Sequence, residues 1–301
     1  MDLKVRSAAF KWLEEQVALH GDLLPRKILE QGFFINGHRI TLVGPQGIWK
    51  PKALELPLSI TTVVNSPYPD TILMGGLLEY HYRKGGPHHR DNVGLREAMR
   101  RKTPLIYFLG IEPGKYLAEW PVFIVEDIQH AEIFRVLIDE KSLVENFQRS
   151  GPGEVLYASE EYYRRRYVTN QAIARLHQRV FRARVLAAYQ EQCAFCRLRH
   201  PQLLDAAHII PDKEEGGDPV IPNGLSLCKI HHAAFDSNII GVTPNYQIIV
   251  REDILQELDG LMLRYGIQQM HKQKLILPSN KDHWPDRQRL EIRFKKFKEV
   301  S

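Results

Sequence analysis

The sequence predicts an α+β protein of about two domains, and three observations support this class. Between residues 32 and 126, short runs of β-branched and aromatic residues are broken by Gly and Pro, which is typical of a mostly antiparallel or barrel-like sheet. Residues 1–31 and 160–192 instead carry apolar residues at helical spacing. The chain has 301 residues and is 44% hydrophobic, which is enough for ordinary packed cores.

Composition excludes several classes of protein. No stretch approaches the roughly 18 apolar residues that span a bilayer, and residues 1–6 lack the apolar run of a signal peptide. We therefore expect a cytoplasmic protein without a membrane partner. The net charge of +5 mildly favours a polyanionic partner. The chain has three cysteines, too few and of the wrong parity for a disulfide framework.

The pattern along the chain predicts where the elements and domain boundaries lie. The expected strands cover residues 33–35, 40–43, 58–64, 77–82, 105–109 and 122–125, with helices at 1–20, 25–31 and 93–101. Gly and Pro in the run 149–153 predict a linker, because together they interrupt both regular structures. We expect a first domain at 1–150, a linker with an arginine-rich helix at 151–178, and a second domain at 179–301.

The predicted helix at 160–192 is rich in arginine and tyrosine. Its arginines are Arg164, Arg165, Arg166, Arg175, Arg179, Arg182 and Arg184. Arginines that neutralise phosphates supply most of the non-specific affinity for DNA, so we expect Arg179 and Arg182 to contact DNA. The alternative is a solvated charged helix face.

Two pairs of metal-ligand residues follow this helix. Cys193 and Cys196 form a C-x-x-C pair, and Cys228 and His231 form a C-x-x-H pair about thirty residues later. Four such groups suit a tetrahedral zinc ion in a closed site that stabilises the fold. The alternative is two buried thiols beside a surface histidine.

The segments between and after these pairs carry a second motif. They are Leu203–Pro211, which contains His208, then Asn223–Cys228, then His231–Asp236. Here the sequence resembles the HNH (ββα-metal) endonuclease family. The resemblance implies that His208 ends a hairpin strand, that Asn223 lies in the following loop and that His232 lies on the helix.

The resemblance also assigns catalytic roles. Phosphodiester hydrolysis needs a base that activates water and a divalent cation beside the phosphate. His208 would be the base, Asn223 would bond the backbone and orient the imidazole, and His232 would ligate Mg²⁺ or Mn²⁺. Taken alone, His208 would more simply be an ordinary strand histidine with its hydrogen bonds satisfied.

The sequence departs from the family at one position. Many members have an aspartate ligand immediately before the first histidine, where this chain has Ala207. Asp205 lies on the same side of the strand, but we expect it to be too distant from the ion. Asp236 follows His232 by one helical turn and is a candidate ligand. One branch of the family has the same Ala-His pair followed by Phe-Asp.

The first half shows a pattern-level resemblance to another family. Residues 67–70, 77–86, 90–95 and 104–110 look like a diverged SRA domain, an SRA-like (PUA-like) β-barrel covering roughly 33–130. The resemblance implies that a modified cytosine is flipped into a pocket, where Tyr68 stacks on it and Asp70 accepts from its amine. Tyr80 and Tyr82 are further candidates for base contact. Alternatively, Tyr68 and Asp70 form an ordinary turn, and Tyr80 and Tyr82 pack on one strand face.

Together, these resemblances predict a modification-dependent restriction endonuclease. Its substrate would be double-stranded DNA bearing a modified cytosine, and its ions would be structural Zn²⁺ and catalytic Mg²⁺ or Mn²⁺. A single HNH site hydrolyses one strand, so we expect a homodimer. One alternative is a non-catalytic, zinc-stabilised DNA-binding protein, supported by Ala207. The other is an HNH nuclease whose first domain senses a different ligand.

Overall fold

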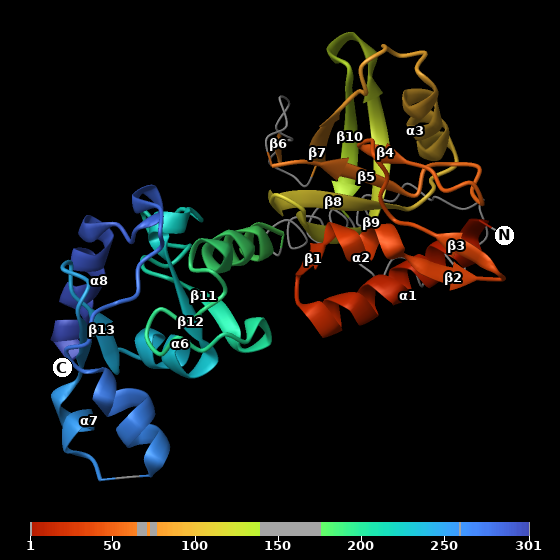
Figure 1. Ribbon diagram of the computed structural model, residues 1–301. Coiled ribbons are helices and arrows are strands. Elements are labelled where there is room, and N and C mark those ends of the chain that lie inside the picture. The colour runs from red at the N-terminus through yellow and green to blue at the C-terminus, as the bar shows by residue number, and fades with distance from the viewer. Residues whose placement is uncertain (1, 65–70, 73–76, 139–175, 259, 301) are drawn as a thin grey trace, which may run out of the picture. The chain divides into compact units, whose positions relative to one another are not determined.

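The computed structural model describes residues 2–64, 71–72, 77–138, 176–258 and 260–300 (Figure 1). The chain divides into two compact units, residues 1–176 and 177–301. The predicted linker at 149–153, as well as Tyr68 and Asp70, lie outside the described residues. None of the described helices is both long and apolar enough to cross a membrane.

Unit 1 is built on a mixed sheet of eight strands. In spatial order these are β4 (Ile48–Trp49), β5 (Ser59–Thr62), β8 (Leu105–Glu112), β9 (Lys115–Ile128), β10 (Ile133–Ile138), β7 (Leu77–His81) and β6 (Thr71–Ile72), and β1 (Leu23–Pro25) also pairs with β9. Strands β5 and β8 are parallel, and the other pairs are antiparallel. The remaining elements are α1 (Asp2–His20), α2 (Arg26–Gln31), the hairpin of β2 (Phe33–Ile35) and β3 (His38–Ile40), α3 (Arg90–Arg100) and η1 (Gln129–Ala131).

Strand β9 organises this sheet. It is 14 residues long, and its first half pairs with both β8 and β1 whereas its second half pairs with β10. A strand that changes partners along its length bends the sheet, and the sheet is curled (Figure 1). Within the described part of unit 1, β4 and β6 end the strand order and do not pair with each other. The α+β class is confirmed, whereas the SRA-like barrel stays a prediction.

Helix α1 closes one part of the core and carries a buried charge. Its residues Val5, Ala9 and Leu13 are at most 1% exposed and join the same core as β8. Arg6, which is 1% exposed, pairs with Asp2 and donates hydrogen bonds to the carbonyl oxygens of Pro57 and Pro104 at 2.9 Å. The guanidinium therefore joins α1 to two loops, which offsets the cost of burying its charge.

Unit 2 begins within a helix at residues 176–188. It continues with η2 (Pro201–Leu203), β11 (Leu204–His208), η3 (Ile221–Asn223), β12 (Gly224–Cys228), α6 (Lys229–Asp236), β13 (Ile240–Val242), β14 (Ile248–Val250), α7 (Glu252–Gln256), the π-helix η4 (Met262–Ile267), η5 (Gln268–Met270), η6 (Lys281–His283) and α8 (Arg287–Val300). The antiparallel hairpin β11–β12 followed by α6 forms a ββα element (Figure 1). A second hairpin, β13–β14, packs beside α8.

Candidate active site and metal centre

Four side chains of unit 2 form a group that can hold a metal ion. The ligand atoms of Cys193, Cys196, Cys228 and His231 all lie within 4.8 Å of one another. Cys193 and Cys196 lie on the turn that follows the helix at residues 176–188. Arg197 closes this turn in the left-handed region, at φ 64°, where its N–H donates to the carbonyl oxygen of Cys193. Cys228 ends β12, and His231 lies in the first turn of α6. The structure thus brings all four predicted ligands together.

Hydrogen bonding defines which nitrogen of His231 faces the sulfur atoms. Its Nδ1 lies 3.4 Å from Sγ of Cys193 and 3.2 Å from Sγ of Cys228. Its Nε2 donates to the carbonyl oxygen of Gly266 in η4 at 2.7 Å. Metal-bound histidines commonly use their second nitrogen in this way, and the bond fixes the tautomer that a ligand needs. Gly266 was not predicted from the sequence.

The chemistry of this group fits a structural metal ion. Hydrogen bonds with the other two thiols raise the pKa of Cys196 and lower that of Cys228. Three thiolates this close repel one another unless a cation lies between them. Three sulfur atoms and one imidazole complete four-coordination, which leaves no open position for a substrate.

His208 lies at the end of β11, opposite Gly224 of β12. Its ring stacks on Phe181, with centroids 4.0 Å apart and planes at 20°. Its Nε2 is buried and has no hydrogen-bond partner among the described residues, a costly arrangement for which a catalytic role is one usual explanation. Burial lowers the pKa of His208, which favours the neutral imidazole, the form that can accept a proton.

Asn223 is fully buried and holds the chain that follows His208. Its side chain accepts from the backbone N–H of Ile210 at 2.9 Å and donates to the carbonyl oxygens of Ile210 and Asp218 at 3.0 and 3.1 Å. Its own carbonyl oxygen accepts from the N–H of Ile209 at 2.9 Å. Asn223 therefore fixes the backbone at the end of β11.

His232 lies between two carboxylates. Its Nδ1 is 3.5 Å from Oδ2 of Asp205, and its Nε2 is 3.2 Å from Oδ2 of Asp236. The hydrogen bonds to Asp205 and Asp236 raise the pKa of His232 to about 9. Ala207 is fully buried in the core of unit 2, so its position in the strand offers no ligand. Asp205, which we expect to be too distant to ligate the ion, lies 3.5 Å from Nδ1 of His232 and so belongs to the cluster around it.

The other predicted site residues lie in several places. Arg182 donates to the carbonyl oxygens of Pro201 and Leu204 at 2.9 and 2.8 Å, and Arg179 is partly buried on the same helix. Tyr80 and Tyr82 are 6% and 7% exposed, so both rings lie within unit 1. The hydroxyl group of Tyr82 bonds Asp127 and Arg96, and its ring packs on Phe134.

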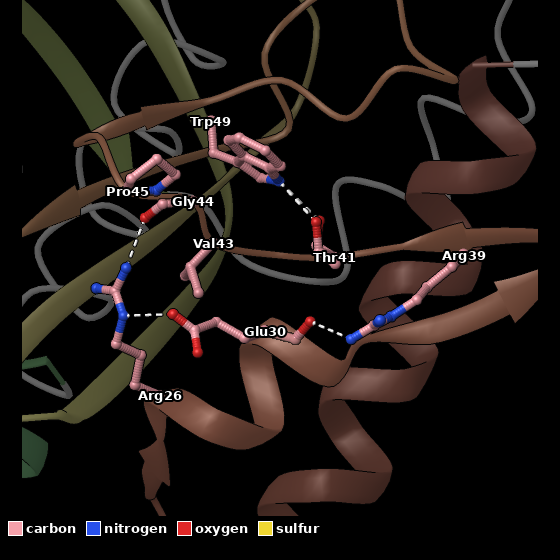
Figure 2. Close-up of a pocket in the computed structure, with 8 residues that line it drawn as sticks. All are labelled: Arg26, Glu30, Arg39, Thr41, Val43, Gly44, Pro45 and Trp49. Atoms are coloured by element: carbon pink, nitrogen blue, oxygen red, sulfur yellow. Dashed lines mark hydrogen bonds and ion pairs between the residues drawn. The ribbon is translucent and has the colours of Figure 1, made fainter.

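A hollow of about 370 Å³ lies elsewhere in unit 1 (Figure 2). It is lined by Arg26, Glu30, Arg39, Thr41, Val43, Gly44, Pro45 and Trp49. Arg26 pairs with Glu30 and donates to the carbonyl oxygen of Gly44, while Arg39 donates to the carbonyl oxygens of Glu30 and Gln31. Trp49 donates to Thr41. These bonds hold the wall together, and we assign no ligand to this hollow.

The hairpin, helix and adjacent four-ligand group define a ββα-metal nuclease domain. In agreement, residues 193–243 match the family model of the HNH endonucleases. The predicted HNH resemblance is confirmed, and the chain carries an HNH endonuclease domain in unit 2.

The solved structures that match this chain include two restriction enzymes. One is titled "Modification dependent TagI restriction endonuclease", with 14% identity, a TM-score of 0.29, and coverage of 80% of this chain and 81% of that chain. The other is titled "Structure of the Type IV phosphorothioation-dependent restriction endonuclease ScoMcrA", with 16% identity, a TM-score of 0.21, and coverage of 58% and 52%. A comparison with curated proteins gave no match.

The packing at Gly224 gives a testable prediction. A Cβ there would lie 2.4 Å from Cγ2 of Val185 and 2.9 Å from Cζ of Phe181, whose ring stacks on His208. We expect Gly224→Ala to displace the helix at 176–188 and to lower the free energy of unfolding of unit 2 by about 1–3 kcal/mol. Urea unfolding measures this change. Gly260→Ala is the control, because a Cβ there has nothing within 4 Å; equal losses in both variants would contradict the prediction.

Proposed function

We propose that the protein is a metal-dependent DNA endonuclease that hydrolyses phosphodiester bonds at the HNH site and acts in restriction. One observation carries this proposal. His208, Asn223 and His232 occupy the strand end, the loop and the helix of one ββα element, inside the region that matches the HNH family.

The described contacts support a role for His208 as the general base. A ring nitrogen of His208 takes a proton from water, whose oxygen bonds to phosphorus as a bridging P–O bond breaks. This step needs the neutral imidazole, and burial lowers the pKa of His208 in the required direction. The Phe181 ring and the backbone contacts of Asn223 hold the imidazole in place.

Two ions complete the proposed site. Cys193, Cys196, Cys228 and His231 hold a structural zinc ion, whereas His232 and Asp236 hold Mg²⁺ or Mn²⁺. When bound, the second ion stabilises negative charge on the phosphate and the leaving oxygen. The short distance between His232 and Asp236, 3.2 Å, supports their use as a pair.

The role proposed for unit 1 rests on the SRA-like pattern in its sequence. In this proposal unit 1 flips a modified cytosine out of double-stranded DNA, with Tyr68 stacking on the base and Asp70 accepting from its amine. The curled sheet is compatible with such a domain. Cleavage of both strands then needs two HNH sites, which a homodimer supplies.

The zinc assignment predicts that folding of unit 2 depends on metal. Purified protein should contain about one zinc per chain, because thiolate sites couple metal binding to folding. Cys228→Ser should abolish the cooperative melting of unit 2, as followed by calorimetry and by elemental analysis. Ser237→Ala, an exposed change on the same unit, should leave both unchanged. A folded and active preparation without zinc would show that the assignment is wrong.

The assignment of His208 predicts loss of cleavage without loss of folding. His208→Ala should reduce the rate of plasmid nicking in Mg²⁺ or Mn²⁺ by about 10²–10⁴-fold, the usual contribution of a general base. DNA binding and zinc content should stay near wild type. His200→Ala is the matched control, since His200 is exposed. Cleavage by His208→Ala at the wild-type rate would refute the assignment.

The role of unit 1 predicts a preference for modified DNA. At equal ionic strength, plasmids with 5-methyl, 5-hydroxymethyl or glucosylated cytosine should be cleaved at rates that differ from those of unmodified plasmid. Tyr68→Ala should remove most of the preference, because base stacking contributes about 1–3 kcal/mol. Phe34→Ala, an exposed aromatic change in unit 1, should keep it. Equal cleavage of every substrate would contradict this role and leave the nuclease assignment intact.

A further inference from the structure

Asp205 lies three residues before His208 on β11, and its two oxygen atoms have different partners. Oδ1 accepts from the backbone N–H of Ala206 at 2.9 Å and lies 3.5 Å from Nε of Arg182. Oδ2 lies 3.5 Å from Nδ1 of His232. One oxygen is therefore held by a backbone N–H and an ion pair with Arg182, and the other faces the histidine.

Arg182 is itself held in place. Its guanidinium donates to the carbonyl oxygens of Pro201 and Leu204, which precede and begin β11. Its position is thus tied to the strand that carries Asp205. The two residues form a fixed support on one side of the His232 ring.

The opposite side of the ring faces a second carboxylate. Nε2 of His232 lies 3.2 Å from Oδ2 of Asp236, on the same helix and one turn later. A metal-bound histidine commonly binds the ion with one nitrogen and donates its other N–H to a carboxylate. The side chain of Asp236 is 58% exposed and can join His232 at an ion, whereas the nearer oxygen of Asp205 faces the other nitrogen.

We propose that Asp205 is a positioning residue that accepts the Nδ1–H of His232 and so directs the Nε2 lone pair toward Asp236 and the catalytic ion. This inference rests on the proposed function, in which His232 binds that ion. It gives the strand carboxylate a role outside the metal coordination shell.

The hydrogen bonds of Asp205 make Asp205→Asn a sharp test. We expect the amide oxygen to occupy the Oδ1 position, because the N–H of Ala206 donates there and the Arg182 guanidinium lies 3.5 Å away. The amide NH₂ then faces Nδ1 of His232 and favours the tautomer with its proton on Nε2. That tautomer cannot offer Nε2 to a metal ion.

The experiment uses the full chain loaded with zinc and measures Mn²⁺ binding by the EPR signal of free Mn²⁺. We expect Asp205→Asn to weaken Mn²⁺ binding by about 10–100-fold, the usual effect of losing such a support. Plasmid cleavage by this variant should recover at saturating Mn²⁺, and Asp205→Glu should regain part of the affinity. Asp253→Asn is the control, since Asp253 pairs with Arg251 and not with a histidine.

Each alternative outcome has a definite meaning. Wild-type Mn²⁺ affinity in Asp205→Asn overturns the inference. A loss of cleavage that excess Mn²⁺ does not restore also overturns it. In both cases the nuclease assignment stands. If Asp205→Asn does not fold, Arg182→Lys decides: weaker Mn²⁺ binding supports the inference, and unchanged binding overturns it. A wild-type protein that neither binds Mn²⁺ nor cleaves DNA overturns the proposed function and this inference together.

Discussion

The convergence of three cysteines and His231 on one small volume is the constraint on which the rest of unit 2 depends. These side chains come from the turn at 193–196, the end of β12, and the first turn of α6, and His231 also bonds η4 through Gly266. A group that joins four segments fixes where α6 begins relative to the hairpin. Because neighbouring residues on a helix point about 100° apart, His231 can face the sulfur atoms while His232 faces the strand that carries Asp205.

The pKa values of two histidines of the site are shifted in opposite directions, and the surroundings of each side chain explain the difference. Burial lowers the pKa of His208, which stacks on Phe181 and leaves Nε2 without a partner among the described residues. Hydrogen bonds to two carboxylates raise the pKa of His232 to about 9. In enzymes, two titratable groups whose pKa values are shifted in opposite directions commonly take different roles in catalysis. Under the proposed function, these opposite shifts suit His208 as a neutral base and His232 as a ligand that exchanges its proton for a metal ion.

Sequence patterns found most of the strands in unit 1 but not their full extent. The run at 77–82 became β7, and the run at 105–109 became the longer β8. β10 was missed, although its residues alternate between half-buried and buried faces. Only residues 122–125 of β9 were expected, and the strand also contains Pro121, a residue that normally argues against a central strand. The predicted strand at 40–43 contributes only Ile40 to β3, since Thr41 accepts from Trp49 instead.

The sequence by itself determined the α+β class, the four residues of the Cys3His group and the order of His208, Asn223 and His232, because these depend on residue type and local spacing. Only the tertiary structure decided which side chains meet across elements. Asp205 and His232 are separated by 27 positions, and they meet because α6 packs on β11. Phe181 reaches His208 only because Gly224 has no side chain that would displace the helix at residues 176–188. Such contacts depend on how helices pack against strands, and no spacing in the sequence encodes that packing.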